Sequence, residues 1–276
     1  MKRVIRIVLD IVIAVCVVGI LVGAVRFGIH FYNKSKTEEM YQQISEEARV
    51  SAAAKPAEEH GNLNAENDVS NDEIEEKYQS PIDFEMLWEI NTEIVAWIEI
   101  KDTQIDYPVL FFDGNESYYV NHDFYKNRTD HGSIFFGKES GIQDSAKYYR
   151  IIYGHHMMDG TMFADLIKYR DKKFTEEHSK ITLYWGDSQT DYQVVAVFTS
   201  DVSADLQDGF YYSEHLERNH FNYTYMKTEI SKRQLFTLET DWTEEDELLL
   251  LSTCEYSTPN GRLVVVAKAL NEESGQ

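Results

Sequence analysis

The chain begins with a long apolar run. Residues 4–25 are interrupted only by Arg6 and Asp10, and the fifteen positions from Ile11 to Val25 are all apolar or glycine. Since a helix rises about 1.5 Å per residue, this run is long enough to cross a hydrocarbon layer about 30 Å thick. The pattern favours a transmembrane anchor over residues 4–25, after a short cytoplasmic N-terminus at residues 1–3. The alternative is a cleaved signal peptide, but charged Arg26 follows the run and no small-residue cleavage site lies close behind it.

The cations beside this run indicate its orientation. Lys2, Arg3 and Arg6 cluster with the free amine at the N-terminal end, whereas the later cations are diluted by Glu38 and Glu39. Positive charge is generally retained on the cytoplasmic side of a membrane. We therefore expect a single-pass protein of the cell membrane, with a cytoplasmic N-terminus and an extracellular domain.

A polar segment follows the apolar run. Residues 26–79 are acidic and lack apolar periodicity, which predicts a stalk that is helical in its first third and flexible afterwards. The folded domain is expected at residues 80–270. Ser80 is a candidate helix cap, and Phe84, Leu87 and Trp88 recur at helical spacing. Residues 271–276 form a polar tail.

From Ile94 onward the pattern changes to short β-rich runs separated by turn residues. Eight such runs in one domain favour a closed or nearly closed barrel over a doubly wound sheet. Stretches after Thr161 and after Tyr211 have helical patterns and are predicted as helices inserted between strands. We therefore predict a mainly β fold, an eight-stranded barrel with short inserted helices and an N-terminal helical extension. The eight runs are IVAWIEI, IDYPVLFF, GSIFFG, YRIIYG, KITLYWG, YQVVAVFTS, LLLLST and RLVVVAKAL.

Composition adds constraints on partners and on cysteine chemistry. The 43% apolar content is enough for a sizeable core, and the net charge of −22 argues against nucleic acid or an anionic membrane surface as a partner. The only two cysteines are Cys16, inside the apolar run, and Cys254. An internal disulfide in the exterior domain is therefore excluded, and Cys254 is a lone thiol.

The surroundings of Cys254 predict a β-hairpin. Pro259, Asn260 and Gly261 are turn residues between two apolar runs, so Cys254 ends one strand and Arg262 begins the next. Adjacent strands lie about 4.8 Å apart, so both side chains can emerge at the same edge of the sheet. A guanidinium there favours a thiolate and can stabilise an oxyanion. The alternative is an inert, buried Cys254 beside a strand-end cation.

A second candidate group follows the run that ends at Gly154. His155 and His156 are adjacent, and neighbouring side chains of an extended segment point to opposite sides, so at most one should face a given cleft. A Cys with a His supplies the minimum for acyl transfer, because the thiolate attacks and the imidazolium protonates the leaving amine. The alternative is a metal site formed by His155, His156 and Asp159.

These motifs together resemble a class B sortase. The motifs YGHHM, LSTCEY and GRLVVVAK occur in the order His, Cys, Arg, and the likeness extends across VAWIEIKDTQIDYPVL, YYVNHDFY and GSIFF. It covers about residues 80–270 and the N-terminal anchor. The resemblance implies a membrane-anchored cysteine transpeptidase of the Gram-positive cell surface, with an eight-stranded sortase barrel and no metal or organic cofactor.

The resemblance also implies roles for particular residues. Cys254 matches the nucleophile, Arg262 the oxyanion-stabilising arginine and His155 the general acid and base, with the backbone N–H of Glu255 as a second oxyanion donor. Ser252 and Glu255 lie beside the thiol, and Phe210 and Tyr211 fall where the family contacts its peptide; the alternative for these two aromatics is ordinary loop packing. The chain departs from the family at Leu250, where threonine is usual, and we expect this side chain to point into the barrel.

The implied reaction is a two-step acyl transfer. The enzyme cleaves a C-terminal sorting signal of secreted proteins, commonly after threonine, and transfers the acyl group from a thioester to an amine of a peptidoglycan precursor. The expected partners are therefore a sorting-signal peptide, that amine, and the membrane through the N-terminal helix. One alternative is a thiol protease that gives the acyl group to water. Another is a non-catalytic adhesion or scaffold domain in which Cys254 is inert.

Overall fold

The computed structural model describes residues 2–55, 78–115, 117–140, 149–202, 210–215, 219–257 and 260–270. The chain divides into two compact units, residues 1–42 and residues 43–276. The flexible part of the predicted stalk, over residues 56–77, and the polar tail at residues 271–276 lie outside the described residues.

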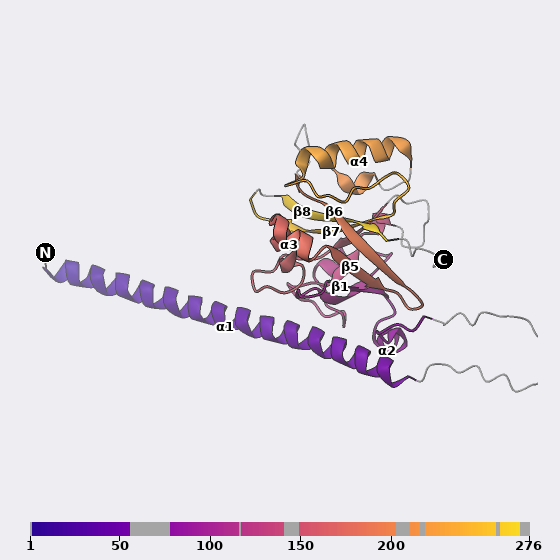
Figure 1. Ribbon diagram of the computed structural model, residues 1–276. Coiled ribbons are helices and arrows are strands. Elements are labelled where there is room, and N and C mark those ends of the chain that lie inside the picture. Colours follow the sequence, from indigo (N-terminus) through magenta and orange to yellow (C-terminus); the bar gives the residue numbers. More distant parts are fainter. Residues whose placement is uncertain are drawn as a thin grey trace, which may run out of the picture. The chain divides into compact units, whose positions relative to one another are not determined.

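The second unit contains a closed β-barrel (Figure 1). The strands are hydrogen-bonded in the order β1-β2-β3-β4-β7-β8-β6-β5, and β5 pairs with β1 to close the ring. The predicted eight-stranded barrel is therefore confirmed. The strands are β1 (Ile94–Glu99), β2 (Asp106–Leu110), β3 (Ile134–Phe136), β4 (Tyr149–Tyr153), β5 (Lys180–Tyr184), β6 (Gln189–Asp201), β7 (Leu248–Glu255) and β8 (Gly261–Ala269).

Short helices occupy several of the connections between strands. The α2 helix begins after Asp83, whose carboxylate accepts a hydrogen bond from the Met86 N–H (3.1 Å), so the cap is Asp83 and the Ser80 cap predicted from the sequence is wrong. Helices follow both Thr161 and Tyr211, as the sequence predicts. The helical elements are α1 (Lys2–Ala54), α2 (Phe84–Ile90), η1 (Tyr118–Val120), η2 (Lys138–Ser140), η3 (Ala164–Arg170), α3 (Lys172–Glu177), η4 (Tyr212–Glu214) and α4 (His220–Arg233).

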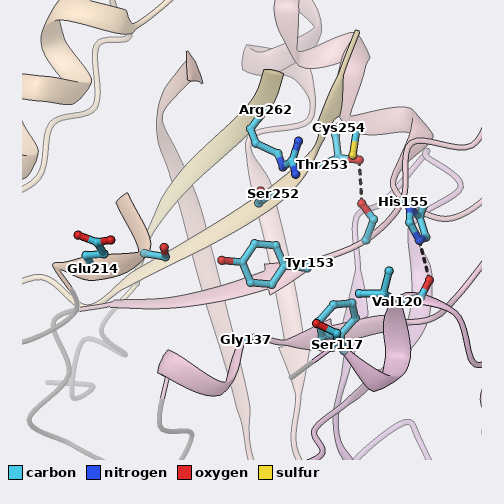
Figure 2. Close-up of a pocket in the computed structure, with 13 residues that line it drawn as sticks. Ser117, Val120, Gly137, Tyr153, His155, Glu214, Ser252, Thr253, Cys254 and Arg262 are labelled. Carbon is cyan, nitrogen blue, oxygen red and sulfur yellow. Dashed lines mark hydrogen bonds between the residues drawn. The ribbon is translucent and has the colours of Figure 1, made fainter. Parts of the chain in front are cut away.

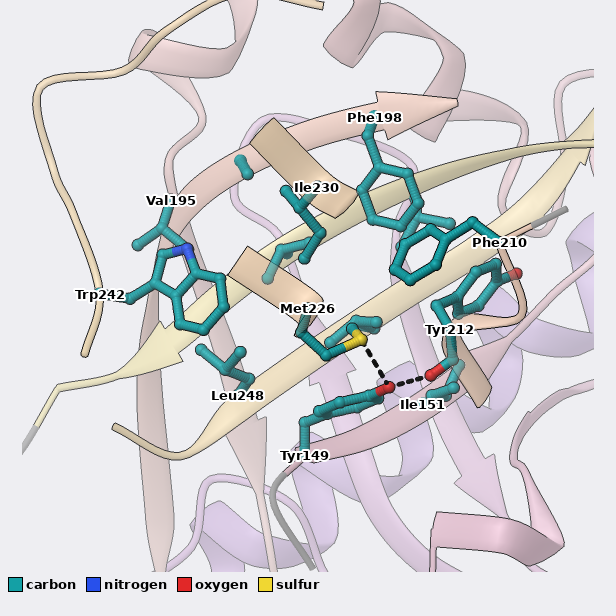
Figure 3. Packing of buried hydrophobic residues seen from close by; sticks show 14 residues of the cluster. Tyr149, Ile151, Val195, Phe198, Phe210, Tyr212, Met226, Ile230, Trp242 and Leu248 are labelled. Carbon is teal, nitrogen blue, oxygen red and sulfur yellow. Dashed lines mark hydrogen bonds between the residues drawn. The ribbon is translucent and has the colours of Figure 1, made fainter. Parts of the chain in front are cut away.

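The α4 helix covers the outer face of the sheet formed by β4, β7, β8 and β6 (Figure 3). Met226 and Ile230 of α4 point down onto this face, and Leu250 of β7 packs in the same cluster. Alternation along the strand then turns Leu249 and Leu251 toward the barrel interior. The expectation that Leu250 points into the barrel is therefore wrong, because this side chain is buried under α4.

The C-terminal part of α1 belongs to the barrel unit. Ile44, Ala48 and Ala52 are buried, and the Arg49 guanidinium contacts Glu99 (3.1 Å) on β1 and Asp106 (2.8 Å) on β2. The buried positions recur every four residues, which is the spacing of one helical face. The structure thus places residues 43–54 with the barrel, where the sequence predicts part of the stalk.

The first unit consists of the N-terminal part of α1. The side chains of residues 12–26 are exposed. Within the described part of the chain, no helix reaches the length and apolar character that crossing a membrane requires. The anchor over residues 4–25 stays a prediction.

Candidate active site

The β7–β8 hairpin brings Cys254 and Arg262 together. The two residues are paired directly across the antiparallel strands, as the sequence predicts, although the turn residues 258–259 lie outside the described residues. The Arg262 guanidinium donates to the carbonyl of Gly261 (3.0 Å) and lies on the same side of the hairpin as the thiol (Figure 2). Cys254 is partly buried and lines a cavity.

Pairing of β4 with β7 delivers His155 to the same place. Tyr153 is in register with Ser252, and the hydrogen bonds continue beyond the strand, since the Gly154 N–H donates to the Ser252 carbonyl (3.2 Å). The Thr253 hydroxyl donates to the Gly154 carbonyl (2.8 Å). His155 therefore leaves β4 beside Cys254.

Gly154 is required at this point by close packing. A Cβ on this residue would lie 2.5 Å from Cδ1 of Ile134 and 2.7 Å from Cδ2 of Phe163. Real Cβ atoms do not approach other atoms so closely. The glycine therefore lets the segment that carries His155 pack closely against the side chains of Ile134 and Phe163.

His155 and Cys254 lie beside each other at the cavity, and each stabilises the charged form of the other. The interaction between the two side chains raises the pKa of the imidazole and lowers the pKa of the thiol, against the effect of partial burial on both groups. The positive charge of Arg262 lowers the pKa of Cys254 further. The arrangement favours a thiolate beside an imidazolium.

A backbone carbonyl fixes the orientation of the imidazole. Nε2 of His155 donates to the carbonyl oxygen of Val120 in η1 (2.7 Å), which leaves Nδ1 for Cys254 (Figure 2). This contact also raises the pKa of His155. An imidazole that is hydrogen-bonded at one nitrogen and faces the nucleophile with the other is suited to move a proton to and from a reacting group.

The pair lies at one end of a cavity of about 520 Å³. This size is within the range of small-ligand and peptide side-chain pockets. Figure 2 shows Cys254, His155 and Arg262 at one end and Glu214 at the other, with Tyr153 between them. The lining residues are Ser117, Val120, Phe135, Gly137, Tyr153, Gly154, His155, Ser213, Glu214, Ser252, Thr253, Cys254 and Arg262.

Comparison with known proteins gives the family of this chain. The family described as "Sortase domain" matches residues 98–270. Sortase B of Listeria monocytogenes is 32% identical over 188 residues, which cover 67% of this chain and 73% of that protein. Sortase B of Staphylococcus aureus is 32% identical over 189 residues, which cover 68% and 74%. The chain belongs to the sortase family. Its named relatives place it in class B, and it is a cysteine transpeptidase of cell-wall sorting.

Solved sortase B structures agree with this assignment. The enzyme from Bacillus anthracis aligns with a TM-score of 0.64 at 27% identity, over 87% of this chain and 99% of that one. The Clostridium perfringens enzyme gives 0.58 at 28% identity, over 68% and 100%. A substrate complex of the S. aureus enzyme gives 0.58 at 30% identity, over 68% and 84%. Family membership disfavours a non-catalytic adhesion domain.

The predicted substrate-binding residues of this sortase are not all at the cavity. Ser252 lies in its floor and exchanges a hydrogen bond with the Tyr212 hydroxyl (2.8 Å). Phe210 is 1% exposed and packs in the hydrophobic cluster beneath α4, so its side chain does not line the cavity. Tyr211 follows it and is likewise absent from the lining.

Glu255 is also held away from the cavity. Its carboxylate accepts a hydrogen bond from Arg170 of η3 (2.8 Å) and further hydrogen bonds from Ser257. Because successive residues of β7 face opposite sides, this side chain lies across the strand from the Cys254 thiol. The side chain of Glu255 therefore stabilises the end of the hairpin.

His156 plays a different part from His155. His155 lines the cavity and His156 does not, which confirms that only one of the two faces the cleft. Nδ1 of His156 donates to the Cys254 carbonyl (3.2 Å), and its ring stacks on Tyr256 at 5.2 Å between centroids. Within the described part of the chain, no group of three or more His, Cys, Asp or Glu could hold a metal. Asp159 instead bonds to His131, so the metal alternative does not fit these residues.

Several residues of the site carry no signal in the sequence. The Val120 carbonyl is a backbone group, so its side-chain type does not mark it. Tyr153 and Glu214 reach the cavity only because β4 and η4 end beside it. The segment YYVNHDFY, which contains Val120, belongs to the resemblance and is a sequence signal for this side of the site.

Proposed function

We propose that this sortase cleaves a peptide sorting signal through Cys254, with His155 and Arg262 as its catalytic partners. The observation that carries the proposal is that His155, Cys254 and Arg262 line one end of the same cavity, with Cys254 and Arg262 paired directly across the hairpin. Each of the three groups has the chemistry that one part of an acyl transfer needs.

The first step forms a thioester. The Cys254 thiolate attacks the scissile carbonyl, and the electron pair of the C=O bond moves onto oxygen. Arg262 and the Glu255 backbone N–H donate to this oxyanion. The tetrahedral intermediate then collapses, the C–N bond breaks, and the imidazolium of His155 gives its proton to the departing amine.

The second step releases the acyl group. An incoming amine attacks the thioester, His155 accepts the proton of that amine, and the thiolate of Cys254 leaves. The accepting amine in our proposal belongs to a peptidoglycan precursor. The substrate is a secreted protein whose C-terminal signal is cut after threonine, with the residues that precede the cut lying along the floor at Ser252.

The location proposed for the enzyme follows from its substrates. The domain acts outside the cell, and the apolar run over residues 4–25 anchors it in the membrane with its N-terminus in the cytoplasm. Support comes from the exposed apolar side chains of α1 at residues 12–25, which no polar residue interrupts. Exposed apolar surface of this extent is favourable only in an apolar medium.

Product analysis tests the reaction. A fluorescent peptide that extends beyond the threonine of a sorting signal is incubated with and without a glycine-based amine. We expect a ligated product when the amine is present, and slow hydrolysis without it. If the amine leaves the product unchanged and water is always the acceptor, the protein is a thiol protease. Turnover that survives Cys254→Ala would exclude the proposed nucleophile.

A further inference from the structure

A His–carboxylate pair lies buried between the two segments that carry His155 and Val120. Nε2 of His131 is 2.8 Å from Oδ2 of Asp159, and the two side chains are 4% and 1% exposed. No step of the reaction uses either group. Burying a polar or charged pair generally costs stability. A buried pair next to the active site is therefore a candidate for a functional role.

One member of this pair belongs to the segment that carries His155. Asp159 lies four residues after His155, and its Oδ1 accepts hydrogen bonds from the Thr161 N–H (3.1 Å) and hydroxyl (2.7 Å). The Phe163 N–H closes the loop by donating to the His155 carbonyl (2.9 Å). Burial opposes ionisation of Asp159, but the hydrogen bonds from Thr161 and His131 hold its pKa below the usual value. Asp159 is therefore ionised, and its hydrogen bonds hold this loop in place.

The other member belongs to the segment that carries Val120. His131 precedes Gly132, which has φ +59°, and a Cβ on Gly132 would lie 2.5 Å from the Val120 carbonyl oxygen. The N–H of Ser133 donates to the Tyr119 carbonyl (2.9 Å). The chain at His131 and Gly132 therefore lies directly against the carbonyl that accepts from His155.

Beyond the pairing of β3 with β4, two further hydrogen bonds join these segments and form a ring. One joint is the hydrogen bond from His155 to the Val120 carbonyl (2.7 Å), and the other is the bond between His131 and Asp159. A single hydrogen bond leaves an imidazole free to turn about it, whereas a second joint fixes the distance between the two segments. We propose that His131 and Asp159 are a positioning pair that holds His155 in the orientation that presents Nδ1 to Cys254.

Two substitutions of His131 separate this role from a structural one. Asparagine loses the Nε2 position and cannot reach Asp159, whereas glutamine places its amide nitrogen near that position. We expect His131→Asn and Asp159→Asn to lower kcat about tenfold with KM within twofold, since misplacement of a catalytic group acts on the chemical step. His131→Gln should stay within about threefold of the parent. The His131→Asn/Asp159→Asn double variant should lose no more than the worse single variant.

The titration of Cys254 distinguishes a positioning role from a purely structural one, because loss of stability alone does not change it. Alkylation by iodoacetamide is followed against pH by mass spectrometry of the peptide that contains Cys254, so that Cys16 does not contribute. We expect the midpoint to rise in His131→Asn and in Asp159→Asn, and to stay unchanged in His131→Gln. His220→Asn is the matched control, because His220 pairs with Glu244 (2.7 Å) on the surface.

The inference rests on the roles proposed for His155 and Cys254, but different results would overturn the two proposals. If Cys254→Ala still turns over, the proposed function falls. If Cys254→Ala is inactive while His131→Asn and Asp159→Asn lower only the melting temperature, the positioning role falls. Equal losses in His131→Asn and His131→Gln would also overturn it. Gly132→Ala disturbs the same ring at Val120 and should reproduce the rise in midpoint.

Discussion

The charges of His155 and Cys254 depend on each other, and this sets the pH dependence of the enzyme. The pKa of Cys254 lies below that of an ordinary thiol and the pKa of His155 above that of an ordinary imidazole. The thiolate is present above the first value and the imidazolium below the second. Both shifts bring the two ranges toward overlap. We expect a bell-shaped profile of kcat/KM against pH, measured with a fluorescent peptide, and a profile that only rises with pH would contradict the imidazolium as acid.

Removing the imidazole should raise the pKa of the thiol. In His155→Asn, Cys254 loses the hydrogen bond that lowers its pKa most, so its alkylation midpoint moves to higher pH. His178→Asn is the control, since His178 ends α3 and does not line the cavity. A midpoint that is equal in both variants would show that the pair does not form in solution.

The guanidinium of Arg262 should matter more in the transition state than in the bound substrate. Loss of one oxyanion donor typically costs about 100-fold or more in kcat. We therefore expect Arg262→Gln to lower kcat by about this factor in steady-state assays with the sorting peptide, while KM changes little. An effect confined to KM would instead make Arg262 a substrate-binding residue.

The motifs YGHHM, LSTCEY and GRLVVVAK, taken in this order, predict three residues that all line the cavity, His155, Cys254 and Arg262. The residues that orient them were not predictable in the same way. Val120 contributes a carbonyl, which every residue has, and His131 and Asp159 meet only after two loops have folded. Their spacing of 28 residues fits no local motif.

At the scale of elements, β7 explains where reasoning from the sequence stops. Both faces of this strand are buried, one in the barrel and one under α4, so its run of leucines shows no alternation. The strand and the barrel can still be predicted from such a run. The face of the strand on which Leu250 lies cannot be predicted from it. The same layer contains Phe210, which explains why a residue expected at the peptide is in the core.

The position of Phe210 predicts a loss of stability. Truncation of a buried phenylalanine typically costs about 3–5 kcal/mol. Phe210→Ala should lower the free energy of unfolding in urea by this amount, whereas Phe221→Ala, at a side chain that is 71% exposed, should change it by less than about 0.5 kcal/mol. If Phe210→Ala left the stability unchanged and raised KM, Phe210 would instead be a peptide-binding residue.

At the scale of the whole molecule, the C-terminal end of α1 contributes to the barrel unit. Ile44 is 2% exposed and Val50, on the same helix, is 64% exposed. Ile44→Ala should therefore lower the free energy of unfolding by about 2–5 kcal/mol, as other buried truncations do, and Val50→Ala should have little effect. Equal melting temperatures for the two variants would mean that residues 43–54 behave as part of the stalk.

The barrel, its helices and the three reacting side chains together support one central claim, that Cys254 carries the acyl group between two substrates. Mass spectrometry of the intact protein, incubated with a library of proline-threonine sorting peptides and no amine, tests it most directly. The account predicts an added mass equal to that of the peptide fragment that ends at threonine, less one water, located on Cys254 and absent in Cys254→Ala. Cleavage of the peptide with no adduct on Cys254, or an adduct on another residue, would contradict it.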